Sequence, residues 1–202
     1  MKQCIWIRHG KTKGNEEARY IGTEDEVLSW CGIKELEEKR QSGYYPPADF
    51  VFVSPMKRCK QSAELIYPGI PKWEIASFRE INFGEFEGKN YKELSGNPSY
   101  QKWIDSGGTL PFPNGESREQ LKVRCKNGFL EALRILEKEE TKRTITRVAF
   151  LVHGGTIMAI LDTFSRGNYF DFQCRNGTGF FCDLKEESEM PVFDNIRRLG
   201  ER

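Results

Sequence analysis

Short apolar runs, separated by stretches of helical or turn-like character, constrain the fold of this chain more than any other feature. Five runs are rich in strand-forming residues: 4–7, 50–53, 73–76, 148–152 and 179–184. Strand patterns that alternate with helical patterns are typical of βαβ units. Strands that are apolar throughout are typical of a parallel sheet covered on both faces. The sequence therefore predicts an α/β fold, a three-layer α/β/α arrangement with a mostly parallel central sheet.

Helices are expected at 33–41, 57–66, 89–95, 98–106, 117–140 and 155–164. The longest has the clearest signal, because Ser117 and Gln120 form a capping-box pattern and apolar residues then recur on one face. Gly128 inside it costs about 1 kcal/mol relative to alanine, which indicates close packing there. Segment 107–115 is rich in glycine and proline, and we expect an active-site loop. Residues 186–198 fit either a last strand or a loose tail.

Length and charge narrow the possible partners. The 202 residues contain no repeat or linker, so we expect a single domain over 1–202. The 31 Lys and Arg against 30 Asp and Glu leave a net charge of +1, which creates no global field for nucleic acid or a membrane surface. No apolar run approaches the roughly 20 residues of a spanning helix, and the N-terminal run is too short for a signal peptide. We expect a cytoplasmic monomer or homodimer that binds a small molecule.

The cysteines are scattered and suggest no metal or redox centre. They form no Cys-x-x-Cys pair and have no histidine at ligand spacing, which disfavours zinc and thioredoxin-like chemistry. We expect six reduced thiols: Cys4, Cys31, Cys59, Cys125, Cys174 and Cys182. Cys59 stands out because it adjoins Arg58, and its oxidation could perturb that arginine.

Both histidines of the chain, His9 and His153, close an apolar run and are followed by glycine. Arg8 ends the first run, Arg58 follows the second and Glu80 follows the third. The carboxyl ends of parallel strands meet at one edge of a sheet, where such folds bind ligands. Guanidinium groups match phosphate oxygens, and a neutral imidazole is a nucleophile for phosphorus. The set predicts a phosphoryl-transfer pocket that needs neither a glycine-rich phosphate loop nor magnesium, and we expect no cofactor.

An ordered series of motifs resembles the histidine phosphatase superfamily, also called phosphoglycerate mutase-like, along most of the chain. The segments that carry the resemblance are 8–15, which begins Arg-His-Gly, 22–25, 54–63, 80–88, 115–117 and 153–154. Arg-His-Gly alone is a weak signal, whereas the ordered series is specific. The resemblance implies a phosphoglycerate mutase-like fold.

The resemblance also implies roles for the residues. His9 would attack the phosphoryl group and form a phosphohistidine, while Arg8, Arg58 and His153 hold the oxygens of that group. Glu80 would protonate the leaving oxygen and then activate water. By the same resemblance, the Asn15 side chain and the Gly154 backbone amide would also reach the phosphate.

Each of these residues also has a simpler interpretation. A histidine at a strand end is usually structural, and Arg58 lies in a charged run that could be solvated. Glu80 could belong to a charged surface loop, with Glu87 as the competing acid. Asn15 could serve only as a helix cap. For Asn176, which precedes a glycine, a turn is the favoured interpretation.

The residues after Glu80 favour a phosphatase over a mutase. The mutases of this family follow the catalytic glutamate with Arg-His-Tyr-Gly, whereas this chain has Ile-Asn-Phe-Gly, and the span 88–115 leaves little room for a lid that excludes water. The resemblance points to the branch of α-ribazole phosphatases and broad phosphomonoesterases, and thus to a small phosphorylated metabolite as substrate. The alternatives are mutase-type phosphoryl transfer, a non-catalytic phospho-ligand binding module, and a metal or thiol enzyme. The expected substrate walls are Tyr20, Ile21, Phe83, Phe86, Trp103, Leu110 and Phe112.

Overall fold

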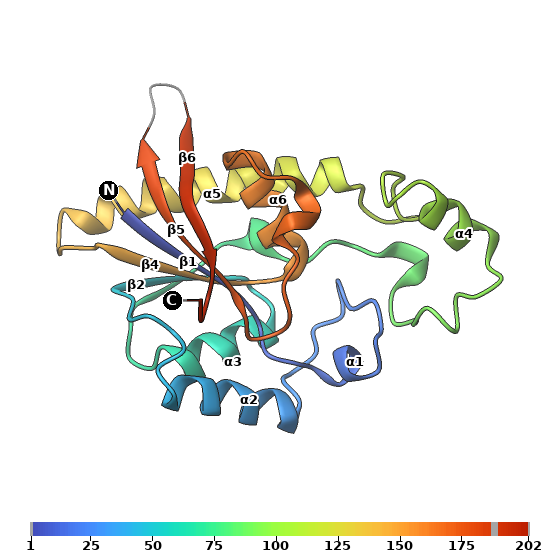
Figure 1. Cartoon of the computed structure of the whole chain (residues 1–202), viewed down its shortest axis with the longest axis horizontal. Coiled ribbons are helices and arrows are strands. Elements are labelled where there is room, and N and C mark those ends of the chain that lie inside the picture. Colours follow the sequence, from blue (N-terminus) through green and yellow to red (C-terminus); the bar gives the residue numbers. More distant parts are fainter. Residues whose placement is uncertain (1, 187–189, 202) are drawn as a thin grey trace.

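The computed structural model describes residues 2–186 and 190–201, whose strands form a six-stranded sheet (Figure 1). The strands are β1 (Lys2–Arg8), β2 (Phe50–Val53), β3 (Lys72–Glu74), β4 (Arg147–Val152), β5 (Gly179–Glu186) and β6 (Pro191–Arg198). Their order is β3-β2-β4-β1-β5-β6. The first four in that order pair in parallel, and β5 and β6 pair antiparallel. The prediction of a mostly parallel α/β sheet is confirmed.

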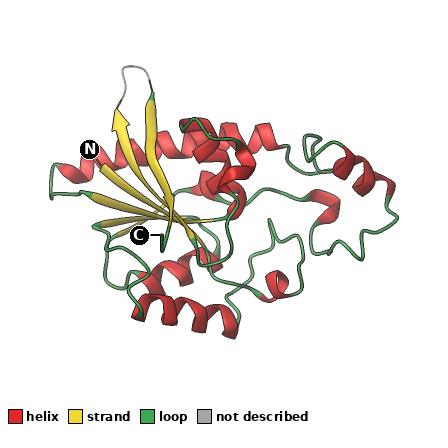
Figure 2. Ribbon diagram, viewed as in Figure 1, coloured by secondary structure: helices red, strands yellow, loops and turns green. Residues whose placement is uncertain are grey.

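Helices cover both faces of the sheet, giving three layers (Figure 2). α2 (Trp30–Gln41) and α3 (Lys57–Ile66) pack on one face, and α5 (Arg118–Glu140) and α6 (Gly154–Phe164) pack on the other. The short α1 (Lys13–Glu16) and α4 (Pro98–Asp105) lie to one side of the sheet in Figure 1. Three 3-10 turns complete the described elements: η1 (Ala76–Phe78), η2 (Gly84–Phe86) and η3 (Tyr169–Phe172).

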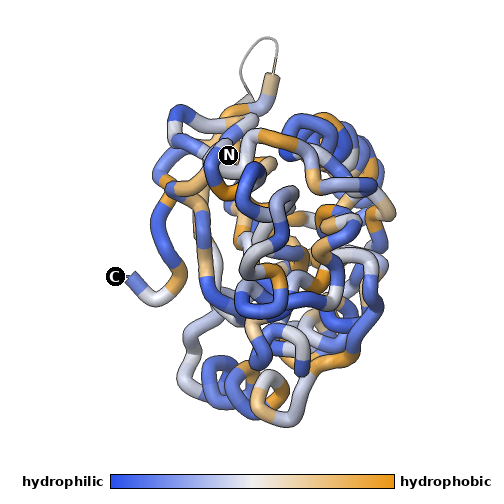
Figure 3. Tube along the Cα trace, turned by 90° about the vertical axis from the view of Figure 1, so that its right-hand side faces the viewer, coloured by the Kyte–Doolittle hydropathy of each residue, from blue (hydrophilic) through white to orange (hydrophobic). Residues whose placement is uncertain are grey.

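The side chains of the central strand β1 show why helices cover both faces of the sheet. Trp6 packs into the core under α5 and α6, whereas Ile5 and Ile7 pack into the core under α2 and α3. Trp6 stacks on Phe150 of the neighbouring strand β4, with 4.0 Å between ring centroids. Coiled segments of the trace in Figure 3 carry both hydrophilic and hydrophobic residues, as expected of helices with one buried face. The layers therefore bury the sheet and leave its carboxyl edge for the site.

The longest helix begins and packs as its sequence predicts. The Ser117 hydroxyl accepts a hydrogen bond from the Gln120 amide (3.1 Å), and the Gln120 side chain accepts one from the Ser117 amide (2.8 Å). A Cβ at Gly128 would lie 2.7 Å from the Ser77 Cβ, so only a glycine lets the helix approach η1 this closely. No helix among the described residues is long and apolar enough to cross a bilayer.

Two predicted elements differ from the structure. The helix expected over 89–95 is wrong, because residues 91–96 form turns. Asn90 accepts hydrogen bonds from the Lys92 and Glu93 amides, which competes with helix formation, and Gly96 has a φ of 81°. The third strand ends at Glu74 instead of residue 76, because η1 begins at Ala76. Of the two alternatives for the C-terminal segment, residues 191–198 form a strand, while 187–189 lie outside the described residues.

Candidate active site

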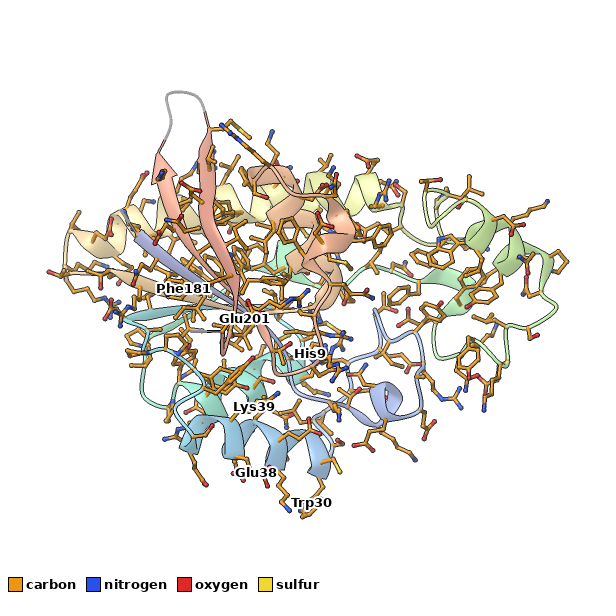
Figure 4. All side chains as sticks on the ribbon, viewed as in Figure 1. His9, Trp30, Glu38, Lys39, Phe181 and Glu201 are labelled. Atoms are coloured by element: carbon orange, nitrogen blue, oxygen red, sulfur yellow. The ribbon has the colours of Figure 1, made fainter. Side chains whose placement is uncertain are left out.

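A cavity of about 390 Å³ lies at the carboxyl edge of the sheet, and it gathers most of the predicted site residues. Its lining includes seven of them: Arg8, His9, Asn15, Tyr20, Ile21, Glu80 and Gly154. Arg58 and His153 are fully buried and lie outside the lining residues. In Figure 4, His9 lies near the centre of the molecule, below the sheet and above α2, far from Trp30 at the periphery.

His9 has a defined tautomer. Its Nδ1 atom lies 2.7 Å from the carbonyl oxygen of Gly10, and because a carbonyl only accepts, Nδ1 carries the proton. The lone pair of the neutral ring is then on Nε2. Burial, followed by the charges of Arg58 and Arg8, holds the pKa of His9 well below its ordinary value. The imidazole is therefore neutral at neutral pH.

The loop that carries His9 is held by side chains from distant parts of the chain. The Ser62 hydroxyl accepts a hydrogen bond from the Gly10 amide at 2.9 Å. Asn176 donates from Nδ2 to the His9 carbonyl oxygen (3.1 Å) and to Asn15 Oδ1 (3.0 Å). The turn expected after Asn176 is present, since the next residue is a glycine with a φ of 64°. The side chain of Asn176 nevertheless also orders the site, and sequence reasoning missed this contact.

The Asn15 side chain takes part in the cap of helix α1 and also lines the cavity. It is the third residue of the capping box of α1, in which Thr12 accepts a hydrogen bond from the Asn15 amide. Its Oδ1 atom accepts from the Thr12 amide at 3.3 Å, which leaves the Nδ2 group on the side chain as a donor. The capping interpretation is correct, and it is compatible with a place in the cavity lining.

Two arginines supply positive charge at the site, Arg58 from a fully buried position and Arg8 from a partly buried one. Arg58 donates to the carbonyl oxygens of Glu24 (2.7 Å) and Gly22 (3.0 Å), and Arg8 donates to that of Cys174 (2.9 Å). The Nε atom of each is buried without a hydrogen-bond partner, and no carboxylate among the described residues forms an ion pair with either. Buried charge is costly unless it is paired. The arrangement therefore attracts an anion.

His153 lies behind His9, with 5.1 Å between the ring centroids. Its Nε2 atom is 2.7 Å from the Ser54 hydroxyl oxygen and 3.5 Å from the Cys59 sulfur. Burial, followed by the charges of Arg58 and of His9, keeps the pKa of His153 well below its ordinary value. Burial also raises the pKa of the Cys59 thiol to about 12, so this cysteine has little thiolate character.

Glu80 brings a carboxyl group into the same cavity, where it is only 8% exposed. Burial raises its pKa, against the opposing effects of the Ile81 and Gly155 amides and of the arginines. A Cβ at Gly155 would lie 2.5 Å from Glu80 Oε1, so a glycine here lets the carboxyl group approach the start of α6. The group can hold a proton at a higher pH than an ordinary glutamate can.

The competing acid, Glu87, has a different place. Its Oε1 atom accepts hydrogen bonds from the Gly22 amide (2.6 Å) and the Glu24 amide (3.1 Å), and its Oε2 atom accepts from the Phe83 amide (3.3 Å). It is not among the cavity-lining residues. The geometry therefore favours Glu80 as the acid of the site.

Arg124, on α5, holds the backbone that leads into residues 80–88, the acid loop, which carries Glu80 and Glu87. It donates to the carbonyl oxygens of Ser77 (2.7 Å), Arg79 (2.9 Å) and Glu80 (3.3 Å), and it forms an ion pair with Glu116 at 2.6 Å. Nothing in the helical pattern around Arg124 distinguishes it from a solvated residue, so sequence reasoning missed it.

The remaining walls are aromatic and apolar. Tyr20, Ile21, Phe83, Trp103 and Phe112 line the cavity as predicted. Segment 107–115 contributes to the wall, as expected of an active-site loop. Two predictions are wrong, because Phe86 is fully buried in the core and Leu110 is 47% exposed outside the lining. The structure adds residues with no local sequence signal: Met158, Tyr169, Phe170, Gln173 and Arg118.

Comparison with known proteins gives a family match. The sequence model of the histidine phosphatase superfamily (branch 1) matches residues 4–184. Among the described residues, no group of three or more His, Cys, Asp and Glu side chains is arranged to hold a metal ion.

Curated relatives include both phosphatases and mutases. The chain is 29% identical to an uncharacterized phosphatase, PhoE, of Bacillus subtilis over 170 residues, covering 82% of this chain and 78% of the relative. It is also 29% identical to a 2,3-bisphosphoglycerate-dependent phosphoglycerate mutase of Gloeobacter violaceus over 169 residues, covering 80% and 74%. Both matches run along most of each chain.

Solved structures share the fold. The α-ribazole phosphatase of Shigella flexneri aligns with a TM-score of 0.79 at 20% identity, covering 98% of this chain and 96% of that one. A phosphoglycerate mutase from Thermus thermophilus aligns with a TM-score of 0.67 at 22% identity, covering 99% of each chain. The three-layer architecture is therefore common to both.

Proposed function

The chain belongs to the histidine phosphatase superfamily, a membership that supports a phosphatase hydrolase activity, and on that premise we propose that it hydrolyses small phosphomonoesters through a phosphohistidine on His9. In this proposal Arg8, from the lining, and Arg58 and His153, from fully buried positions outside the lining, bind the phosphoryl oxygens, with Asn15 and the Gly154 amide as further donors. Glu80 is the general acid and base. The mechanism requires no metal, because side chains supply the positive charge.

One observation carries the proposal, the surroundings of His9. The neutral ring has its lone pair on Nε2 and lines the cavity, and the charges of the buried Arg58 and the partly buried Arg8 act on it. Neither arginine forms an ion pair with a carboxylate among the described residues. A neutral imidazole can attack phosphorus, whereas an imidazolium cannot. The uncompensated guanidinium groups favour the charge that spreads over the phosphoryl oxygens in the transition state.

The first step transfers the phosphoryl group to the enzyme. The His9 Nε2 lone pair forms the N–P bond in line as the P–O bond to the alcohol breaks. Glu80 gives its proton to the leaving oxygen, which departs as an alcohol. Its buried position and raised pKa suit this step, because an acid that still holds its proton near the working pH is an efficient donor.

The second step returns the enzyme to its starting state. The ionised Glu80 takes a proton from water, the water oxygen bonds to phosphorus and the N–P bond breaks. Inorganic phosphate leaves, and His9 Nε2 regains its lone pair. Two residues therefore serve both steps, with the arginines holding the same three oxygens throughout.

Hydrolysis is favoured over mutase-type transfer by the residues around the acid loop. After Glu80 come Ile81, Asn82 and Phe83, where the mutases of the family carry basic and aromatic groups. The stretch between the acid loop and α5 contains turns and the short helix α4, which is little material for a lid that excludes water. A phosphoenzyme that water can reach is hydrolysed.

The substrate is proposed to carry a ring or apolar part. The cavity walls formed by Tyr20, Phe83, Trp103 and Phe112 would bury such a group beside the phosphate. A nucleotide-like monoester of the kind suggested by the name of the Shigella flexneri relative fits this description. A higher kcat/KM for such an ester than for 3-phosphoglycerate is expected, and the opposite preference would contradict the proposal.

The proposal predicts an acidic to neutral pH optimum. Activity falls at low pH as His9 becomes protonated, and the lowered pKa of His9 moves this limb to more acidic values. Activity falls at high pH as Glu80 loses its proton, and both burial and the bound phosphate move that limb upward. In Glu80→Gln the basic limb should disappear, whereas Glu87→Gln should keep it.

The decisive experiment is hydrolysis of an aryl phosphate in excess chelator. Wild type and the control Lys13→Ala, whose side chain is 82% exposed, should turn over, and His9→Ala should not. Loss of wild-type activity in chelator would contradict the metal-free mechanism. Transfer of phosphate between positions of a phosphoglycerate, without net hydrolysis, would establish the mutase alternative instead.

A further inference from the structure

Arg118, the first residue of α5, has no role in the mechanism above although it lines the cavity. The lining contains three arginines, Arg8, Arg19 and Arg118. Arg8 belongs to the phosphate end. Arg19 is neutralised, because it donates to Glu17 (2.7 Å) and to Glu93 (2.7 Å). Arg118 is therefore the one of these three arginines whose charge neither the phosphate nor a close carboxylate accounts for.

The surroundings of Arg118 leave its donors free. Its guanidinium donates no hydrogen bond within the part of the chain that the structure describes, and its closest carboxylate contact is Glu119, at 3.8 Å on a side chain that is 72% exposed. Two nearby carboxylates already have partners. Glu116 pairs with Arg124 at 2.6 Å, and Asp162 pairs with Lys122 at 2.8 Å.

Aromatic rings hold the side chain in place. The Arg118 guanidinium carbon lies 5.3 Å from the ring centroid of Tyr169 and 6.0 Å from that of Phe170. Both rings belong to η3 and also line the cavity. A guanidinium stacked on rings keeps its planar fork of N–H donors available for an anion. The side chain is only 26% exposed, so water competes less for those donors than at an open surface.

We propose that Arg118 binds a second anionic group, carried by the alcohol part of the substrate, and so selects phosphomonoesters that combine a ring or apolar body with an acid. This inference rests on the proposed function. Arg8 and Arg58 hold the phosphate at one part of the cavity, the aromatic walls cover the body, and Arg118 pairs with the second acid. A carboxylate matches its fork in bidentate geometry.

A matched pair of esters tests the proposal. 4-Carboxyphenyl phosphate and 4-carbamoylphenyl phosphate have nearly the same size and shape, but only the first carries a second anionic group. The ratio of their kcat/KM values should be about tenfold higher in wild type than in Arg118→Gln, the scale of one charge-assisted hydrogen bond. The change should appear in KM, because a contact away from the reacting atoms is equal in ground and transition states. Arg118→Lys should keep part of the preference.

Arg134→Gln is the control, since this arginine lies on the same helix but is exposed and outside the cavity. It should keep the wild-type ratio. If Arg118→Gln lowers kcat/KM equally for both esters, the residue only supports η3 and the proposal is overturned. Equal use of the two esters by wild type overturns it as well, while the proposed hydrolysis stands.

Failure of the proposed function has a separate signature. If wild type hydrolyses neither ester, the catalytic proposal is contradicted, and calorimetric binding of the two esters to His9→Ala then decides the role of Arg118. Tighter binding of the carboxylate, abolished by adding Arg118→Gln, supports the inference. Equal affinities for the carboxylate and the amide overturn it.

Discussion

The two His-Gly corners, His9-Gly10 after β1 and His153-Gly154 after β4, have similar sequences but different surroundings. Each histidine ends a buried parallel strand, and a serine from the β2–α3 region ties each corner, since Ser62 accepts from the Gly10 amide and Ser54 contacts the His153 ring. At the first corner the serine holds the backbone, and the ring faces the cavity. At the second corner the Ser54 hydroxyl is hydrogen-bonded to Nε2 of His153, and the ring is fully buried. A nucleophile needs a free nitrogen, and the first corner alone leaves one in the cavity lining.

The largest difference between the corners should be catalytic. We expect His9→Gln to lose about 10⁶-fold in kcat, as removal of a nucleophile does, and His153→Gln to lose about 10² to 10³, as removal of one charge-stabilising donor does. Rapid acid-free quench with labelled substrate should trap a phosphoenzyme in wild type and in His153→Gln. A phosphoenzyme in His9→Gln would reverse the assignment of the two histidines.

Arg58 serves both corners, because its charge lowers the pKa of each histidine. Arg58→Ala should lower kcat about 10² to 10³-fold, the scale of one preorganised donor to the transition state. Thermal stabilisation by inorganic phosphate should be lost in the same variant. Lys57→Ala, an exposed neighbour, is the control and should behave as wild type. Unchanged turnover in Arg58→Ala would remove this arginine from the site.

Ser62→Ala tests the backbone tie at the first corner. The Gly10 amide would be left buried without its acceptor, so the free energy of unfolding should fall by about 1 to 3 kcal/mol. Urea unfolding measures this loss, and the exposed Ser99→Ala is the matched control. A loss no greater than that of the control would mean that the hydroxyl does not hold the corner.

In stability against pH the two corners should behave alike. Burial is the main cause that lowers the pKa of both histidines in the folded state. As pH falls below the unfolded value of about 6.5, the unfolded chain binds protons that the folded chain does not, so stability falls by up to about 1.4 kcal/mol per pH unit for each histidine. His9→Gln and His153→Gln should each reduce this loss between pH 7.5 and 5. A reduction in only one of them would show that the rings differ in more than access to the cavity.

The smallest effect is expected at Cys59, which contacts the second corner. Its raised pKa and burial make the thiol a poor nucleophile for peroxide. Wild type and Cys59→Ser should therefore lose activity at the same rate in peroxide, as should the exposed-site control Cys31→Ser. Protection by Cys59→Ser alone would restore the idea of redox control at Arg58.

Local signals were sufficient for the elements and for the residues at strand ends. Ser117 and Gln120 predict the start of α5, and the apolar runs locate β1, β2 and β4 because buried strands of a parallel sheet are apolar on both faces. The run that forms β5 is also located, although this strand pairs antiparallel. Sequence alone does not distinguish Glu80 from Glu87 as the acid, since the two side chains have the same chemistry. The structure separates them, because Glu80 lines the cavity whereas Glu87 accepts hydrogen bonds from the 22–24 backbone.

Contacts between distant segments could not be read locally. Asn176 reaches His9 and Asn15 across more than 160 residues, and nothing near it in sequence distinguishes this contact from an ordinary turn. The same applies to Arg118, whose ring partners belong to η3, an irregular element without a period. At residues 91–96 a local contact overrides a local pattern. The stretch has a helical pattern, but the Asn90 side chain accepts hydrogen bonds from two backbone amides and the residues form turns.

The sequence by itself determined the α/β class and the chemistry gathered at the strand ends, because strand burial and residue type are local properties. The tertiary structure decided which histidine keeps a free nitrogen, which glutamate enters the cavity and which cavity-lining arginine donates no hydrogen bond within the described part of the chain. Those distinctions depend on burial and hydrogen bonding between segments far apart in the chain, and they exist only once the layers have packed.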